Sequence, residues 1–291
     1  MFLKNLLFKP NLIAFYKDEE TYKVLNEQYK KNEIIFSETK EFENKKELLN
    51  YISSVIEDNP QTYVSTFVST QNQGAVPSCD KHTYKEYGIE LDNVKTVCVN
   101  NKYSFYITIY ELMETKKEYK YIDFLYSAFA LVDFKSSLRH NSLYILSTKE
   151  NSYIIIYKDH IPVFSDIFDT VTDEEEIEDN AIEDISDIDI VEDFDETLDE
   201  DIENVDDNEI ENEEENIENL NLEYKITEHI KTALKEYYEG GGDFIEKIFI
   251  FDTIGMEKNI TDIINDELFI EVSLEKFDIL KTINEISRKN V

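Results

Sequence analysis

Histidine and cysteine are the side chains that could do chemistry in this chain, and they are few and scattered. The four histidines show no HxxxH or HExxH spacing, so no metal site is predicted from His82, His140, His160 or His229. Cys79 lies close in sequence to His82, as in a nucleophilic pair. A cysteine nucleophile also needs an oriented imidazole and an oxyanion site, and the sequence has a pattern for neither. We therefore predict no catalytic residues and interpret the histidines as surface or turn residues.

Cysteine usage and hydropathy both indicate the cell interior. Cys79 and Cys98 form neither a CxxC pair nor a larger cysteine framework, which is typical of a reducing compartment, so we expect two structural thiols. No apolar run reaches the roughly 20 residues that a membrane span needs, and Lys4 and Lys9 interrupt the apolar N-terminal residues. The sequence thus predicts a cytoplasmic protein that reaches a membrane only through partners.

Acidic residues are concentrated in one segment, residues 172–223. The chain has 65 Asp and Glu against 29 Lys and Arg, a formal net charge of −36. The segment holds 27 of these acids and no Lys, Arg or His; subtracting them leaves 38 acids against 29 bases, a net charge of −9. Self-repulsion and scarce apolar mass predict a disordered insertion or transient helix. Its isolated isoleucines leave two roles open, a solvated spacer or a docking segment for a basic partner.

Nucleic acid is not an expected partner. Contacts to phosphates need clustered Lys and Arg, and the sequence has no basic stripe with interleaved aromatic residues.

The elements of the first half are predicted from runs of β-branched and aromatic residues and from one amphipathic pattern. Leu48, Ile52, Val55 and Ile56 recur at helical spacing, and Pro60 ends that pattern. The run 103–121 mixes both signals, and we favour a helix there. The expected elements are strands at 12–16, 21–29 and 33–37, a helix at 45–59, strands at 62–69 and 94–99, and a strand entering a short helix at 122–132.

The second half repeats this order. Three strands are expected at 143–148, 152–159 and 161–168, followed after the acidic segment by a helix that begins at Lys225 and that Gly240 caps. A strand, helix, strand and helix are expected at 245–252, 256–266, 268–274 and 275–287. Two such halves predict an α/β fold of two subdomains with an internal structural duplication, divided as 1–140 and as 141–171 with 224–291.

This order of elements resembles the actin-like (ribonuclease H-like) fold. The run SLYILSTKENSYIIIYKDHIPVFSDIF is similar to the second three-stranded meander of the type IV pilus M protein and the cytoplasmic type II secretion L protein family. The run from Glu228 to Ser273 is similar to that family's closing helix, strand, loop, helix and strand. The resemblance implies a scaffold in an inner-membrane assembly platform. Its implied partners are the cytoplasmic tail of a membrane subunit and an assembly ATPase.

The resemblance also implies where a nucleotide would bind, and the sequence departs from the pattern there. Nucleotide-binding actin-like proteins use glycine in their two hairpin turns, whereas the turns at 16–22 and 147–153 contain none. Without glycine the backbone cannot approach phosphates closely. If ATP with magnesium bound, its contacts would be Lys17, Thr148, Asn151 and Gly255.

Three functions follow from these observations. The first is a non-catalytic scaffold without a cofactor, the second an actin-like ATPase, and the third an acidic interaction protein for a basic partner.

Overall fold

The computed structural model describes residues 9–30, 33–170 and 207–291, with side chains from 221 onward in the last range. The first sheet has the order β3-β2-β1-β4-β8. Its strands β1, β2 and β3 form an antiparallel meander, and β4 and β8 add in parallel. The strands are β1 Asn11–Asp18, β2 Thr21–Lys30, β3 Glu33–Phe42, β4 Thr62–Val68 and β8 Phe124–Ser127.

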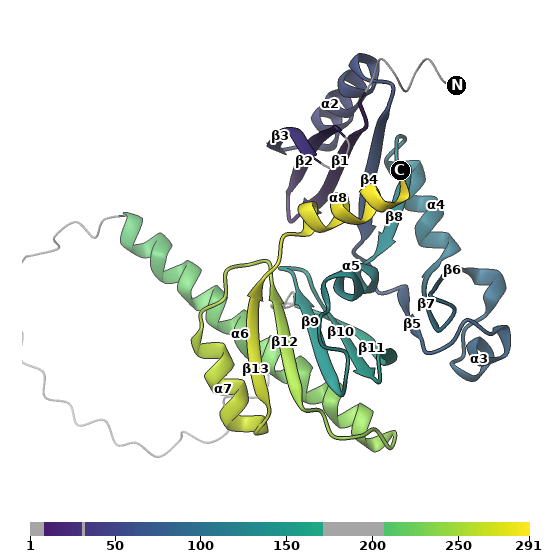
Figure 1. The fold of residues 1–291 in the computed structure, drawn as a ribbon. Helices are drawn as coiled ribbons and strands as arrows, with labels where there is room; N and C mark the ends of the chain where they lie inside the picture. Colours follow the sequence, from purple (N-terminus) through teal and green to yellow (C-terminus); the bar gives the residue numbers. More distant parts are fainter. Residues whose placement is uncertain (1–8, 31–32, 171–206) are drawn as a thin grey trace, which may run out of the picture.

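Helix α2 (Lys45–Asp58) covers the outer face of the first sheet (Figure 1). The side chain of Asn44 accepts a hydrogen bond from the Glu47 amide and so caps the start of the helix. Leu48 and Ile52 pack on Ile13 and Val64, which is the amphipathic pattern expected from the sequence.

A small antiparallel sheet is inserted between β4 and β8 and lies beside the second sheet, with β5 next to β11 (Figure 1). Its strands have the order β5-β7-β6, so β6 is paired on one side only. The inserted elements are β5 Gln73–Val76, α3 Lys81–Glu86, the 3-10 turn Leu91–Asn93, β6 Val94–Val99, β7 Tyr103–Thr108 and α4 Ile109–Glu118.

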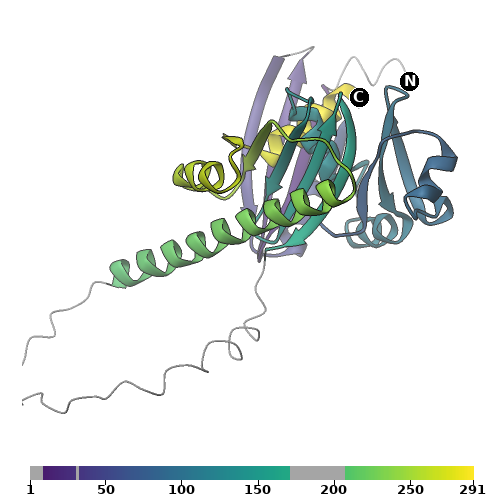
Figure 2. The ribbon, with the colours of Figure 1, turned by 90° about the horizontal axis from the view of Figure 1, so that it is seen from below.

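The second sheet repeats the architecture of the first, with the order β11-β10-β9-β12-β13. Figure 2 shows the long helix α6 lying along it, and α7 covers the same face. The elements are β9 Ser142–Ser147, β10 Asn151–Lys158, β11 Ile161–Asp169, α6 Asp207–Glu239, β12 Lys247–Asp252, α7 Asn259–Leu268, β13 Glu271–Lys276 and α8 Ile279–Asn290.

The central core lies between the two sheets and includes α5 (Ala128–Lys135) and α8. The C-terminal helix α8 leaves the second sheet and packs on the first (Figure 1). Its side chains form buried hydrogen bonds there: Asn284 donates to Glu27 Oε2 at 2.9 Å, and the Ser287 and Ser65 hydroxyls lie 2.8 Å apart.

Most expected elements are confirmed, including both meanders and the α/β duplication. The preference for a helix over all of 103–121 was wrong, because Tyr103, Phe105 and Ile107 alternate into the core as β7 before α4 begins. Between the expected strands at 62–69 and 94–99, where no element was predicted, the structure has β5 and α3. The predicted cap follows Glu239, with Gly241 rather than Gly240 in the left-handed conformation at φ 83°.

The acidic segment is only partly described, since residues 171–206 lie outside the described residues. Its last part belongs to α6, which begins at Asp207, so the helix starts earlier than the Lys225 start predicted from the sequence. Glu and Leu have high helix propensity, and the packed C-terminal part of α6 provides a helix from which they continue.

The expectation of two separate thiols was wrong, because Cys79 and Cys98 form a disulfide with a Cα–Cα distance of 5.6 Å. Cys79 follows β5, whereas Cys98 lies in β6. The chain reversal through α3 brings these positions together, and a separation of 19 residues in sequence does not reveal it. The inference of a reducing compartment from cysteine spacing therefore loses its basis.

Candidate functional site: an apolar groove beside the small sheet

The cleft between the two halves, where the sequence placed a possible nucleotide, is nearly filled. Its cavity measures about 10 Å³, which is room for roughly one water molecule. Three interactions cross it. Lys149 Nζ lies 3.1 Å from Glu19 Oε2, and the Ser69 carbonyl accepts hydrogen bonds from Asn151 Nδ2 at 3.0 Å and from Tyr153 Oη at 2.8 Å. The two glycine-free turns thus bind each other rather than framing a space.

Of the four residues named for a nucleotide, Lys17, Thr148 and Asn151 lie in or beside the cleft, and Gly255 lies in the loop after β12. Lys17 and Thr148 line the small cavity. Thr148 Oγ1 closes its own turn, accepting from the Asn151 amide at 3.0 Å and donating to the Asn151 carbonyl at 2.9 Å. Gly255 is not among the cavity-lining residues; its amide donates to Asp252 Oδ1 at 2.9 Å in the loop after β12.

A much larger groove lies between the small sheet and the first half, with a cavity of about 760 Å³. Residues of β6 and β7 form one side, and residues of β8, α5 and the end of α8 form the other. Its lining is mainly apolar: Val97, Val99, Phe105, Ile107, Leu112, Phe124, Leu125, Tyr126, Ala130, Phe134 and Ile286. Both β6 and β8 are edge strands of their sheets, and open strand edges carry backbone groups that can pair with an extended peptide.

A buried polar cluster around Asp133 lies at the inner end of this groove. Asp133 Oδ1 accepts hydrogen bonds from Tyr103 Oη and Tyr157 Oη, both at 2.9 Å, and lies 3.2 Å from Arg139 Nη1. Burial raises the pKa of Asp133, and the nearby Arg139 charge and the two hydroxyls partly oppose that rise. Because Tyr103 is in β7, Asp133 in α5 and Tyr157 in β10, the cluster joins the small sheet to both halves.

The charges around the groove are unequally satisfied. The Asp123 carboxylate accepts the Val64 amide at 2.9 Å, and Asp133 is occupied as described. Lys95 and Lys116 are exposed and line the groove, and neither forms an ion pair among the described residues. The two lysines thus outnumber the exposed Asp123 carboxylate, which favours an apolar ligand that carries acidic groups.

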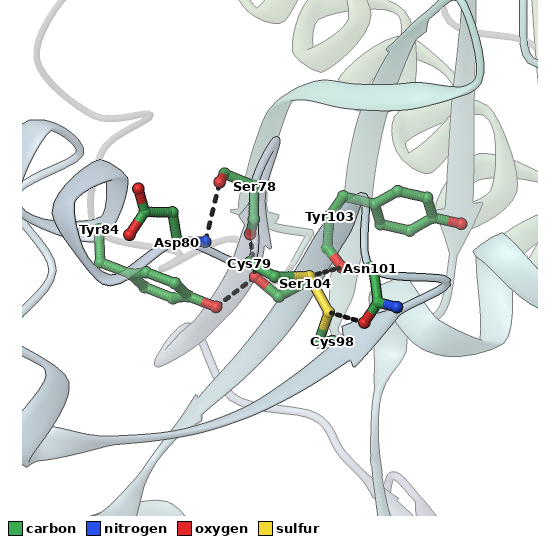
Figure 3. The surroundings of a disulfide bond; sticks show 8 residues. All are labelled: Ser78, Cys79, Asp80, Tyr84, Cys98, Asn101, Tyr103 and Ser104. Atoms are coloured by element: carbon green, nitrogen blue, oxygen red, sulfur yellow. Dashed lines mark hydrogen bonds between the residues drawn. A yellow bond between two sulfur atoms is a disulfide. The ribbon is translucent and has the colours of Figure 1, made fainter.

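The disulfide lies on the small sheet, directly beside the β6–β7 hairpin (Figure 3). Ser104 Oγ of β7 donates to the Ser78 carbonyl at 2.7 Å and also bonds to the Tyr84 hydroxyl. Neither the groove nor this bond was predicted from the sequence. The sequence signal for the groove was in VKTVCV, where alternate residues of a strand place Val97 and Val99 on one face; Val97 is 62% exposed there.

A metal site is not evident within the described ranges, which contain no group of three or more His, Cys, Asp and Glu side chains placed to hold an ion. In the same ranges, no helix has the length and apolar character needed to cross a membrane.

Two sequence families match this chain. Residues 143–291, just over half the chain, match the family described as Domain of unknown function (DUF8341), and residues 8–133 match Domain of unknown function (DUF8569). No curated protein matches the sequence significantly.

Among solved structures, a Bacteroides thetaiotaomicron protein of unknown function with an actin-like ATPase fold aligns with a TM-score of 0.50 at 8% identity, covering 94% of this chain and 95% of that one. The PilM–PilN type IV pilus biogenesis complex gives 0.48 at 7% identity, covering 94% and 90%. The cytoplasmic domain of EpsL, from the type II secretion system of Vibrio cholerae, gives 0.42 at 9%, covering 97% and 95%. The chain has an actin-like fold, as the order of its elements predicted.

Proposed function

This chain belongs to the family of the DUF8341 domain. We propose that it is a non-catalytic actin-like scaffold that binds an extended segment of a partner in the apolar groove. The partner in this proposal is the cytoplasmic tail of an inner-membrane subunit in a type IV pilus, pseudopilus, DNA-uptake or type II secretion platform. An assembly ATPase is a further partner. The protein would work in the cytoplasm, next to the membrane to which its partner is attached.

The observation that carries the proposal is the difference in volume between the cleft that separates the two halves and the apolar groove. The interdomain cleft offers about 10 Å³ and is crossed by Lys149–Glu19 and by two hydrogen bonds to Ser69, whereas the groove offers about 760 Å³ with an apolar lining. Pockets of 300–1,000 Å³ that are mostly apolar, with a few polar groups, are typical ligand sites. The space available in this conformation therefore favours a binding role over nucleotide chemistry.

The shape and charge of the groove indicate the class of ligand. Apolar side chains would enter between β6 and β8, whose free edges offer backbone hydrogen bonds, and acidic groups would pair with Lys95 and Lys116. A short, extended, apolar peptide with an acidic flank satisfies all three features. The membrane-platform assignment comes from the resemblance of the strand and helix order in residues 142–168 and 228–273.

Site-specific photo-cross-linking in the native cell tests this proposal. A photoreactive phenylalanine analogue at Val97 would face the groove, and the same analogue at Met113 is the matched control, because both side chains are 62% exposed and Met113 does not line the groove. We expect position 97 to cross-link to the N-terminal or C-terminal tail of an inner-membrane subunit and position 113 not to do so. Equal products at the two positions, or none at position 97, would contradict the proposal.

A further inference from the structure

The disulfide between Cys79 and Cys98 attaches to the strand that forms one wall of the groove. Cys98 lies in β6, together with the groove-lining residues Val97 and Val99. Because the order of the small sheet is β5-β7-β6, strand β6 is hydrogen-bonded to β7 alone. The disulfide is thus a second attachment of β6 to the rest of the small sheet.

The other contacts of the loop that carries Cys79 end on β7. Ser104 Oγ donates to the Ser78 carbonyl at 2.7 Å, Tyr84 bonds to Ser104, and the Tyr103 carbonyl lies 3.2 Å from Cys79 Sγ (Figure 3). Breaking the disulfide would leave these contacts in place. Its effect would therefore be selective: the loop stays on β7, and β6 loses its second attachment.

The bond is also accessible. Cys98 is an exposed residue on an edge strand, and Cys79 is half-buried behind it. The chain has two cysteines and both are in this bond, so no third thiol within the chain can exchange with it. Exchange requires an external thiolate that can reach a disulfide sulfur, and access decides which sulfur is attacked.

We propose that this disulfide is a reversible latch on the groove, opened by an external dithiol reductant and closed by reoxidation. A thiolate of the dithiol attacks Cys98 Sγ, the S–S bond breaks, and Cys79 leaves as a thiolate that takes up a proton. The second thiol of the reductant then loses its proton and displaces Cys98 from the mixed disulfide as a thiolate, which is protonated in turn. Two electrons and two protons pass to the protein, and the reductant becomes a disulfide.

The consequence for binding rests on the proposed function. With the latch closed, β6 is held against β7 and the groove keeps its wall; with the latch open, β6 frays and Val97 and Val99 lose their fixed positions. The open form should hold an extended ligand more weakly, because ordering β6 again would be part of every binding event.

Hydrogen exchange measures the latch without any ligand. We expect the amides of residues 94–99 that are hydrogen-bonded to β7 to exchange at least about ten times faster after reduction with dithiothreitol, while amides of β10 (residues 151–158) keep their rates. The Cys79→Ser/Cys98→Ser double variant should match the reduced protein, and its far-UV circular dichroism should match that of the oxidised protein. Unchanged exchange at 94–99 in both the reduced protein and the variant would overturn the proposal. The thiol state in the cell is a second test: the protein is quenched with acid directly from the cell and then alkylated. Finding both thiols free in that protein would overturn the proposal as well.

Cross-linking from position 97 then separates the latch from the proposed function. Higher cross-linking yield in the oxidised than in the Cys-free protein supports both. Equal yields despite faster exchange overturn control of the groove by the latch. No cross-link in either state together with faster exchange in the reduced protein overturns the binding function and supports the release of β6.

Discussion

Replacing Asp133 with alanine should destabilise the protein more than any exposed charge deletion, because its carboxylate is the common partner of three groups. Alanine leaves Tyr103, Tyr157 and Arg139 without that acceptor at the junction of the small sheet and both halves. The Asp133 side chain is 12% exposed and the Arg139 side chain 21%, so solvent replaces little of what is lost.

The expected loss in the free energy of unfolding follows from these contacts. Removing one partner of a buried ion pair typically costs about 3–5 kcal/mol. The lower end applies here, about 3 kcal/mol, because Arg139 still donates to the Asp133 backbone carbonyl. For a chain of this size that cost corresponds to a fall in Tm of about 6–12 °C. The variant Asp133→Asn keeps one acceptor oxygen and should lose about half as much.

Calorimetric unfolding of the three proteins measures the effect, with Glu114→Ala as control. Glu114 pairs with Lys117 in α4, and the two side chains are 49% and 78% exposed, so its removal should leave Tm almost unchanged. If Asp133→Ala melts within about 2 °C of the unmodified protein, the cluster does not join the three parts as we argue. An equal loss in Glu114→Ala would point to a general effect of lost acidic charge.

Three further predictions address the cleft, the groove and the pH response. ATP with magnesium should leave Tm unchanged at millimolar concentrations, whereas a ligand at about 100 times its Kd would stabilise the fold by about 2.7 kcal/mol, so a clear upward shift in a thermal-shift assay would favour the ATPase alternative. Val97→Glu should lower binding of an apolar, acidic-flanked peptide at least about tenfold in fluorescence anisotropy, and Met113→Glu should not; equal losses would exclude the groove as the binding site. Burial, together with the negative charges of Glu257 and Asp252, raises the pKa of Glu223 above its ordinary 4.5. The folded state therefore binds more protons than the unfolded state, and the free energy of unfolding falls as pH rises from the ordinary pKa through the raised one. Glu223→Gln should therefore gain stability relative to the unmodified protein at pH 8 and lose that advantage below pH 4, as measured by denaturant unfolding; a constant difference across pH would show that its ionisation is not involved.

The secondary structure was largely predictable because it depends on local patterns. Buried strands carry apolar runs that can be recognised in the sequence, such as Ile154–Ile156 and the segment with Val64 and Phe67. The segment 103–121 was not predictable in the same way, since the alternation of Tyr103, Phe105 and Ile107 occupies only six residues before a helical pattern begins.

The candidate site was much less predictable, for a physical reason. The groove is built from side chains of β6, of the contiguous β8 and α5, and of α8, and these three parts of the chain meet only through the tertiary fold. The disulfide has the same origin. The absence of glycine from the two hairpin turns, by contrast, was visible in sequence, and the turns contact each other across the cleft through Lys149 and Glu19.

The return of α8 to the first sheet has a consequence for how the protein is made. Residues 279–290 are synthesised after every strand of both sheets, yet they fill part of the core against β1 and β2 and supply a buried partner of Glu27. On the ribosome, part of the inner face of the first sheet and the Glu27 carboxylate therefore stay uncovered until α8 has emerged. The first half therefore completes its core only after the second half has been made, and its uncovered apolar surface favours aggregation until then.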